Sequence, residues 1–545
     1  MKISEYLIRA VRKTGTRHVF GIQGDYVLNF YDQLCKSPLK VINTCDEQGA
    51  GFAADAYARV TGFGVVCVTY GVGGLKLANS TAQAFAELSP VLVISGAPGM
   101  SEREGDPLLH HKVRSFETQL NVFREMTSAQ AVLDNAETAA DEIDRVIHAI
   151  HKTKRPGYIE LPRDMVQVEA GESRISFPEQ LSVDRSVVDE ALRKVMAMVA
   201  AAKNPIVIAG AEIHRFGMQQ SLLKFLHRSQ LPFVTGVLGK SVVSENHPQF
   251  IGVYAGAMSP DDIRLAVEEA DCVIAIGPLM TDLSTGIFTQ NIDPARTVAL
   301  MPDSLVIGGS ACPGIGMEYF LKIMIAAMPE SKQPAQPIKR HMLAPFVPEK
   351  DKAITMERLI ACINTFLSDD ITVIAEPGDP LFGALDLRVH DKNEFISCSY
   401  YASLGFSVPA SIGVQLALPN RRPLVLVGDG SFQMTGMELS VAARYGLSPI
   451  IVILNNGGYG TFRHMMDGAF NDIQPWQYAD VIRVIGSGKG YTVSKEEEFV
   501  SVLEAARTNN VSPTVIDVRL GKYDCSQRLK MLTDKLKKRV SYISK

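Results

Sequence analysis

Two glycine-rich turns in the last third of the chain carry side chains suited to holding a diphosphate through a hard cation. One apolar run ends in Gly428-Asp429-Gly430, and after 24 intervening residues a second apolar run ends in Asn455-Asn456-Gly457-Gly458. Asp429 and Asn456 supply oxygen ligands, and the carbonyl of Gly458 can supply a third. Mg²⁺ prefers an octahedron of oxygens and takes the remaining ones from phosphates and water. The turns therefore predict a site for Mg²⁺ and a diphosphate.

The backbone at the first turn also suits an anion. Glycines such as Gly428 and Gly430 permit close approach of the chain, and amide groups at a helix start face the phosphates. We expect Ser431 to cap a helix that continues to about Tyr445 and stops at Gly446. Both turns are expected at the carboxyl ends of strands in one sheet, where open α/β sheets bind ligands. Taken alone, G-D-G also fits a plain turn, and its distance from N-N favours the functional interpretation.

At this spacing the sequence resembles the thiamine diphosphate enzymes, whose signature is G-D-G followed at such a distance by N-N. The resemblance covers residues 4 to 520 and is greatest to the pyruvate and indolepyruvate decarboxylase branch, above all to its phenylpyruvate decarboxylases. ASLGFSVPA looks like the segment that precedes G-D-G in that branch, with Leu404 as the apolar residue that bends the cofactor into a V. The resemblance assigns the remaining cofactor contacts to Gly428, Gly430, Ser431, Ala402, Asp379 and Tyr459.

A carboxyl group in the first third of the chain is the candidate that activates the far ring of the cofactor. Glu47 follows an expected strand at residues 40–43 and leads into an expected helix at residues 50–59. A carboxyl here can exchange a hydrogen bond with a ring nitrogen, which favours the imino tautomer that takes the thiazolium proton. Taken alone, Glu47 would more readily be a first-turn residue that complements the helix dipole. The resemblance favours the activating role, because the family places its glutamate in such a turn.

Groups for proton transfer are predicted in the same third. VFGIQGDY, which contains Asp25, looks like the V-x-G-x-x-G-D-[YF] of the branch, and His110 and His111 look like its paired histidines. Imidazole groups titrate near neutral pH, as proton delivery requires. The blander interpretations are a turn cap for Asp25 and solvated loop residues for the histidines, and adjacent residues rarely chelate one metal. Thr69 is expected to line the pocket.

One position departs from the pattern. Many pyruvate decarboxylases carry a glutamate three residues after the tyrosine of N-N-x-G-Y, and Phe462 stands there in this chain. Phe462 can offer an apolar wall to bulky or aromatic substrates, with Asp25 and the histidines delivering the proton. Alternatively, slower protonation lets the enamine attack an aldehyde and form an acyloin. We favour the first consequence and also place Asp282 near the pocket.

The elements around these residues predict an α/β protein. Apolar strand-like runs alternate with helical segments, as in parallel sheets covered by helices on both faces. Polar or proline-rich segments at residues 170–189 and 329–352 divide the chain. We expect three doubly wound parallel-sheet domains, with ranges 1–170, 190–330 and 353–545. The resemblance makes them a pyrimidine-binding domain, a middle Rossmann-like domain and a diphosphate and Mg²⁺ domain. The middle range lacks a complete G-x-G-x-x-G, so no cofactor is expected there.

The first and last thirds of the chain contain similar sequence segments. LSPVLVISG at residues 88–96 is similar to LSPIIVILN at residues 447–455, and each follows another apolar strand at the same distance. In this register Thr69-Tyr70-Gly71 stands where the later copy has Gly428-Asp429-Gly430. An old duplication explains the similarity, and convergence of similar βαβ units is the alternative.

Composition excludes several classes of protein. With a net charge of −4, the chain has no excess of positive charge for nucleic acid. The eight cysteines are scattered without C-x-x-C or zinc-type spacing, so we expect them to be reduced. We find no signal peptide and no run of roughly 18 apolar residues that would span a membrane. A cytoplasmic protein is expected.

These observations predict an enzyme that decarboxylates a 2-keto acid, aromatic or bulky, through thiamine diphosphate and Mg²⁺. The alternatives are a carboligase that also takes an acceptor aldehyde, and a binding protein that keeps the cofactor without catalysis. The resemblance further implies that Glu47 of one chain faces the metal motif of another. A homodimer is then the smallest active unit, and a homotetramer is common.

Overall fold

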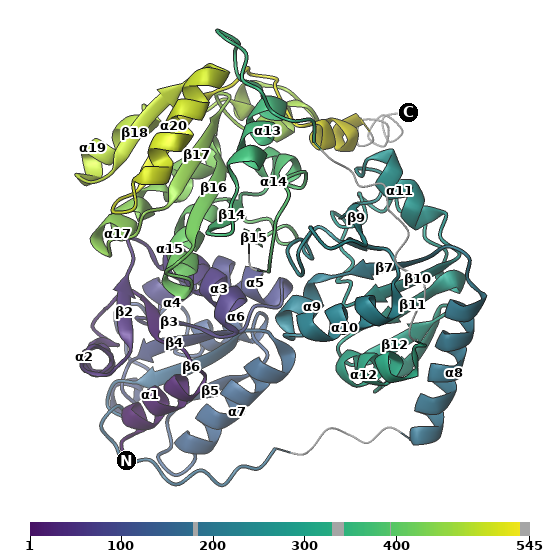
Figure 1. Cartoon of the computed structure of the whole chain (residues 1–545). Coiled ribbons are helices and arrows are strands. Elements are labelled where there is room, and N and C mark those ends of the chain that lie inside the picture. Colours follow the sequence, from purple (N-terminus) through teal and green to yellow (C-terminus); the bar gives the residue numbers. More distant parts are fainter. Residues whose placement is uncertain (178–183, 330–342, 393, 535–545) are drawn as a thin grey trace, which may run out of the picture.

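Three sheets covered by helices build the molecule (Figure 1). The computed structural model describes residues 1–177, 184–329, 343–392 and 394–534. The strands of each sheet come from within one of the three predicted ranges. Residues 178–183, 330–342 and 535–545 of the predicted boundary and terminal segments lie outside the described residues, so the exact limits stay a prediction. Within the described part, no helix has both the length and the apolar character needed to cross a membrane.

The first sheet has six parallel strands in the order β2-β1-β3-β4-β6-β5. Its central strands β3 and β4 are buried at every position, because helices cover both faces of the sheet. The strands are β1 (His18–Gly21), β2 (Lys40–Asn43), β3 (Gly64–Val68), β4 (Val91–Ala97), β5 (Gln130–Val132) and β6 (Gly157–Pro162). The helices are α1 (Ile3–Lys13), α2 (Leu28–Lys36), α3 (Glu47–Thr61), α4 (Val72–Lys76), α5 (Ala78–Ala86), η1 (Ser101–Arg103), α6 (Thr118–Arg124) and α7 (Ala139–Thr153).

The third sheet repeats this arrangement with six parallel strands in the order β15-β14-β16-β17-β19-β18. Thus β16 and β17 occupy the places that β3 and β4 hold in the first sheet, as the similar sequence segments indicate. The strands are β14 (Ile371–Ala375), β15 (Phe395–Ile396), β16 (Arg422–Gly428), β17 (Ile450–Asn455), β18 (Lys489–Val493) and β19 (Thr514–Arg519). The helices are α13 (Met356–Phe366), α14 (Asp379–Ala384), α15 (Ser407–Ala417), α16 (Asp429–Thr435), η3 (Gly436–Glu438), α17 (Leu439–Arg444), α18 (Gly460–Arg463), η4 (Ala469–Asn471), η5 (Tyr478–Asp480), α19 (Val481–Ile485) and α20 (Glu496–Thr508).

The middle sheet departs from the expected parallel arrangement at one edge. Its order is β13-β12-β11-β10-β7-β8-β9, and β12 pairs antiparallel with both of its neighbours, β11 and β13. The connection from β11 to β12 is too short for a crossover helix, so β12 folds back as a hairpin. The strands are β7 (Pro205–Ala209), β8 (Phe233–Thr235), β9 (Phe250–Val253), β10 (Cys272–Ile276), β11 (Thr297–Leu300), β12 (Ser304–Ile307) and β13 (Ser310–Pro313). The helices are α8 (Arg185–Ala201), α9 (Ala211–Arg215), α10 (Gln219–Ser229), α11 (Asp261–Glu268), η2 (Pro294–Arg296) and α12 (Met317–Ala327).

Helices α3 and α15 join the first domain to the third through small residues. A side chain at Gly413 would overlap the backbone carbonyl of Ala53, so the two helices approach at backbone distance. Helix α3 begins at Glu47 and not at the expected residue 50, because Asp46 caps it by accepting a hydrogen bond from the amide of Gln48. The same helix therefore carries the interdomain contact and places Glu47 at its start.

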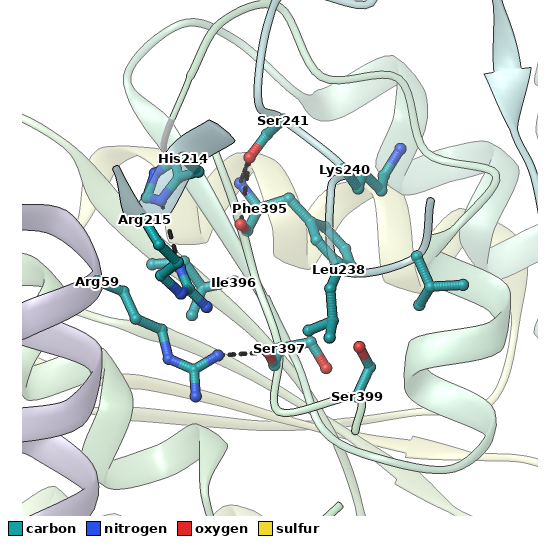
Figure 2. A pocket seen from close by; sticks show the side chains of 11 residues that line it. Arg59, His214, Arg215, Leu238, Lys240, Ser241, Phe395, Ile396, Ser397 and Ser399 are labelled. Atoms are coloured by element: carbon teal, nitrogen blue, oxygen red, sulfur yellow. Dashed lines mark hydrogen bonds between the residues drawn. The ribbon is translucent and has the colours of Figure 1, made fainter. Parts of the chain in front are cut away.

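A buried ionic network joins all three domains at the junction shown in Figure 2. The Arg59 guanidinium donates to the carboxylates of Asp55 and Glu87 at 2.8 Å and to the carbonyl of Ser397 at 2.9 Å. Arg215 of the middle domain donates to the backbone carbonyl of Glu87. Desolvation offsets much of the attraction in such buried pairs, so their main effect is to fix the geometry of the junction.

The helix contact yields a test of the fold. Gly413→Ala forces the two helices apart, and we expect it to lower the free energy of unfolding by about 2 kcal/mol or more. The measurement is chemical or thermal unfolding followed by circular dichroism. Gly236→Ala is the matched control, because an added Cβ there meets nothing within 4 Å. Equal stability of the two variants would contradict the proposed close contact.

Candidate active site

The two predicted turns lie side by side at the carboxyl ends of two neighbouring strands of the third sheet. Strands β16 and β17 are parallel neighbours, with Gly428 opposite Leu454. The carboxylate of Asp429 accepts hydrogen bonds from the amides of Gly430 and Gly457 at 2.8 Å and of Gly458 at 3.0 Å. One side chain thus ties the first turn to the second.

The electrostatics of this edge favour a cation. Burial raises the pKa of Asp429 to about 6, although three backbone amides and Arg463 act in the opposite direction. The side-chain oxygen of Asn456 is buried and has no hydrogen-bond partner in the described part of the chain. A buried carboxylate and an unpaired amide oxygen at one strand edge are donors that a hard divalent cation prefers. The residues present therefore fit such an ion.

A cavity of about 300 Å³ opens beside these turns. The residues predicted to contact the cofactor share its wall, which includes Gly428, Gly430, Ser431, Ala402, Leu404, Asp379 and Tyr459. Asn456, Gly458 and Phe462 also line it. Gly430 leaves room for the ring of Tyr459, because a Cβ at this glycine would lie 2.8 Å from that ring. Burial raises the pKa of Asp379 to about 6, although the amide and hydroxyl of Ser526 donate to its carboxylate.

One local expectation for the first turn is wrong. Ser431 does not cap the helix: α16 begins at Asp429 after the extended residue Gly428, and no side chain caps it. Ser431 falls inside the first turn and faces the cavity instead. The expected helical stretch is present, because α16, η3 and α17 follow one another without a gap as far as Arg444, and the left-handed Gly446 comes close after them.

A glycine loop after β3 gathers the predicted catalytic residues of the first domain. A Cβ at Gly73 would lie 3.2 Å from the Thr69 methyl group and 3.4 Å from a carboxylate oxygen of Glu47. A Cβ at Gly71 would lie 2.7 Å from the Cβ of His111. Side chains at these two positions would separate the three polar residues. The sequence G-V-G-G at residues 71–74 was the signal that could have revealed this packing.

Asp25 and the paired histidines form a second part of this cluster. The Nε2 of His110 lies 2.6 Å from a carboxylate oxygen of Asp25. The ring of buried Tyr26 stacks on His110 at 4.8 Å, and its hydroxyl donates to the His110 carbonyl at 3.2 Å. Sequence reasoning did not assign Tyr26 a role, although it is the aromatic residue that follows G-D in the motif. The stacking orients the imidazole toward Asp25.

The lining of this cavity, as far as the chain is described, does not bring the two sets of residues together. The described lining residues come from the third domain and from Leu283 and Ile287 of the middle domain. Glu47, Asp25, His110, His111 and Thr69 are not among them. Asp282 precedes the lining residue Leu283 but does not itself line the cavity. No sequence motif marked Leu283 and Ile287 as residues that would line the cavity.

Three family descriptions match successive parts of the chain. They are those of thiamine pyrophosphate enzymes: the N-terminal TPP binding domain at residues 1–124, the central domain at residues 192–327 and the C-terminal TPP binding domain at residues 381–518. The cavity, the turn pair and the three sheets thus define the class of thiamine pyrophosphate enzymes.

Curated relatives narrow this class. Indole-3-pyruvate decarboxylase of Azospirillum brasilense is 32% identical over 512 residues, which cover 93% of each chain. Alpha-keto-acid decarboxylase of Mycobacterium ulcerans is 32% identical over 98% of this chain and 96% of its own. Pyruvate decarboxylase 1 of Pisum sativum is 31% identical over 97% of this chain and 92% of its own. The chain belongs to the thiamine diphosphate-dependent 2-keto acid decarboxylase family.

A buried glutamate connects the start of α3 to the third domain. One carboxylate oxygen of Glu438 accepts from the amide of Cys45 at 3.2 Å, and the other is buried without a partner among the described residues. Gly49 leaves space for this carboxyl group. Burial raises the pKa of Glu438 to about 7 from its ordinary value of 4.5. The folded state therefore disfavours the charged form.

The sign of this shift gives a pH-dependent prediction. Between the unfolded and folded pKa values the folded chain holds the extra proton, so stability falls as pH rises and the full loss is present above about pH 7. Glu438→Gln should therefore stabilise the fold by roughly 1 to 3 kcal/mol near pH 8, with a much smaller effect near pH 5. Unfolding midpoints at the two pH values test this, with the exposed Glu104→Gln as control. A gain that does not change with pH would contradict the assignment.

Proposed function

We propose that this protein catalyses non-oxidative decarboxylation of a 2-keto acid to an aldehyde and CO₂, using thiamine diphosphate held through Mg²⁺. The observation that carries the proposal is the buried Asp429 carboxylate, which hydrogen bonds hold to the turn of Asn456. Asn456 lines the cavity, and its side-chain oxygen has no partner among the described residues. The family supplies the reaction class, and the relatives described above are named for decarboxylation. These names favour decarboxylation over acyloin formation and over a non-catalytic binding role.

Residues in and next to the cavity would hold different parts of the cofactor. Asp429, Asn456 and the carbonyl of Gly458 would bind Mg²⁺. Ser431 would approach the phosphates with its backbone amide, and Gly430 would leave room for their close approach. The ring portion would rest against the apolar residues of the wall, which include Ala402, Leu404 and Tyr459. When bound, thiamine diphosphate supplies an electron sink for the electron pair released as CO₂ leaves.

Residues of the first domain would handle the protons. Glu47 would hold and exchange a proton at a ring nitrogen of the cofactor, and its side chain is only 15% exposed. Asp25 and His110 share a hydrogen bond, so they can pass a proton between them. Thr69 begins the glycine loop, His111 packs against this loop at Gly71, and both would contact the substrate.

We propose a homodimer as the smallest active unit and a homotetramer as the assembly. The cavity of one chain, as far as the chain is described, has no lining residue from the first domain. A second copy that presents its Glu47 would complete the site. The eight cysteines are free, which supports the proposal of a cytoplasmic protein.

The side of the cavity near Phe462 supports a bulky or aromatic substrate. Phe462 is half exposed and also lines an adjoining hollow of about 410 Å³. This hollow shares Leu404, Tyr459, Phe462 and Met465 with the main cavity and otherwise includes Met434, Met466 and Phe470. Aromatic and thioether side chains suit an apolar substrate group. Relatives named for indole-3-pyruvate and pyruvate span this range of substrate size.

Glu47→Gln tests the proposed activity. The amide keeps the shape but cannot exchange the proton, so we expect turnover to fall by at least about a hundredfold while the fold and cofactor affinity persist. Turnover is measured as CO₂ release with a panel of 2-keto acids, and thiamine diphosphate binding by fluorescence titration. Glu104→Gln on an exposed loop is the control. Near-normal turnover in the Glu47 variant, or no turnover by the unaltered enzyme, would refute the proposal.

Phe462→Glu tests the proposed substrate class. The aromatic group of bound phenylpyruvate would take water away from the introduced carboxylate, whereas the small pyruvate would not. The ratio of kcat/KM for phenylpyruvate to kcat/KM for pyruvate should therefore fall about tenfold or more. Phe462→Leu keeps an apolar surface and should largely retain the ratio. Steady-state kinetics with both substrates give the measurement. An unchanged ratio in the Phe462→Glu variant would show that Phe462 does not determine the preference for aromatic substrates.

A further inference from the structure

Asp25, His110 and His111 form a cluster with the donor types of a transition-metal site. One carboxylate oxygen and one nitrogen from each imidazole all lie within 4.8 Å of one another. The shortest contact, 2.6 Å, joins His110 Nε2 to the Asp25 carboxylate. The three residues come from two separate loops of the first domain, so the fold and not the sequence brings them together.

The backbone explains how adjacent histidines can contribute to one site. Neighbouring side chains of an extended chain point to opposite sides. His111 has a φ of +67°, in the left-handed region, and its ring centroid lies 4.8 Å from that of His110. Gly71 accommodates this conformation, because a larger residue there would overlap the His111 backbone. The packing therefore holds both imidazoles on the side of Asp25.

The surroundings leave these donors available. His111 Nδ1 is buried and has no hydrogen-bond partner among the described residues. In the single chain the side chains of His110 and Asp25 are 58% and 43% exposed, so the described residues of that chain do not enclose them. Arg163, which packs over Tyr26, is paired with Glu102. Its positive charge is thereby balanced and opposes a bound cation only weakly.

We propose that Asp25, His110 and His111 form a second cation site, selective for Zn²⁺ and similar transition-metal ions, whose occupation inhibits the enzyme. Two imidazole nitrogens and one carboxylate are a common ligand set for Zn²⁺. The oxygen donors of Asp429, Asn456 and Gly458 suit Mg²⁺ instead. Donor chemistry therefore directs the two ions to different sites. The inhibition, unlike the binding, rests on the proposed function.

The inhibition follows from the lone pairs involved. An ion bound at this cluster occupies the nitrogen and oxygen atoms that would otherwise accept and deliver protons. It does not displace Mg²⁺ from the strand edge, so added Mg²⁺ should not restore activity. A chelator that removes Zn²⁺ in the presence of excess Mg²⁺ should restore it.

Zn²⁺ binding is measured on the full chain loaded with thiamine diphosphate and Mg²⁺, by competition with a chromophoric chelator. We expect one site with a dissociation constant in the micromolar range or below, weakened about tenfold or more in Asp25→Asn, His110→Gln and His111→Gln. Asp25→His retains three donors and should bind nearly as the unaltered chain does. His227→Gln, an exposed histidine on α10, is the matched control. Unfolding midpoints establish that each variant is folded.

Co²⁺ serves as the spectroscopic probe. Ligation by nitrogen and oxygen gives visible d–d bands without the near-ultraviolet charge-transfer band of a thiolate, which distinguishes this cluster from a cysteine site. Unchanged Zn²⁺ affinity in the three single variants, a thiolate band, or displacement of Zn²⁺ by Mg²⁺ would overturn the proposal. Because binding is measured without turnover, its outcome is independent of whether the decarboxylase activity is found.

Discussion

The buried carboxylate of Asp429 is the interaction on which the cofactor half of the site depends. It accepts three backbone amides from two turns at the ends of adjacent strands, so it fixes the shape of both turns at once. Those bonds offset only part of the cost of burial, because the pKa of the group remains raised to about 6. A cation bound between this carboxylate and Asn456 would supply the missing compensation. The same residue thus organises the fold locally and provides a donor for the proposed Mg²⁺.

The first and third sheets have the same strand order but carry different chemistry at equivalent strand ends. At the end of β16 stands the carboxylate turn, and at the end of β3 stand Thr69 and a loop with Gly71 and Gly73. In the proposed function one sheet would offer oxygen ligands and amides to a diphosphate, whereas the other would place Glu47 and His111 for proton transfer. Duplication followed by divergence, or convergence of two βαβ units, would both produce this division.

The connections between domains decide which surfaces meet. The contact of Gly413 with Ala53 holds α3 against α15 at backbone distance, and the Arg59 network attaches the middle domain to both others. The middle domain in turn places Leu283 and Ile287 on the wall of the cavity beside the two turns. With this arrangement, the described lining of the cavity in one chain lacks first-domain residues, which is the basis of the proposed dimer.

The sequence by itself determined the three-sheet architecture, the pair of turns and those residues of the cavity wall that lie in the two turns. These features follow from local order: an apolar run makes a buried strand, and a polar turn directly after it must lie at the edge of the sheet. Only the tertiary structure decided the stacking of Tyr26 on His110, the left-handed His111 beside Asp25 and the apolar wall from the middle domain. It also placed Ser431 inside a helical turn and the β12 hairpin at a sheet edge. Such contacts join residues far apart in the chain, or depend on a backbone dihedral angle that packing selects, and no short-range pattern encodes them.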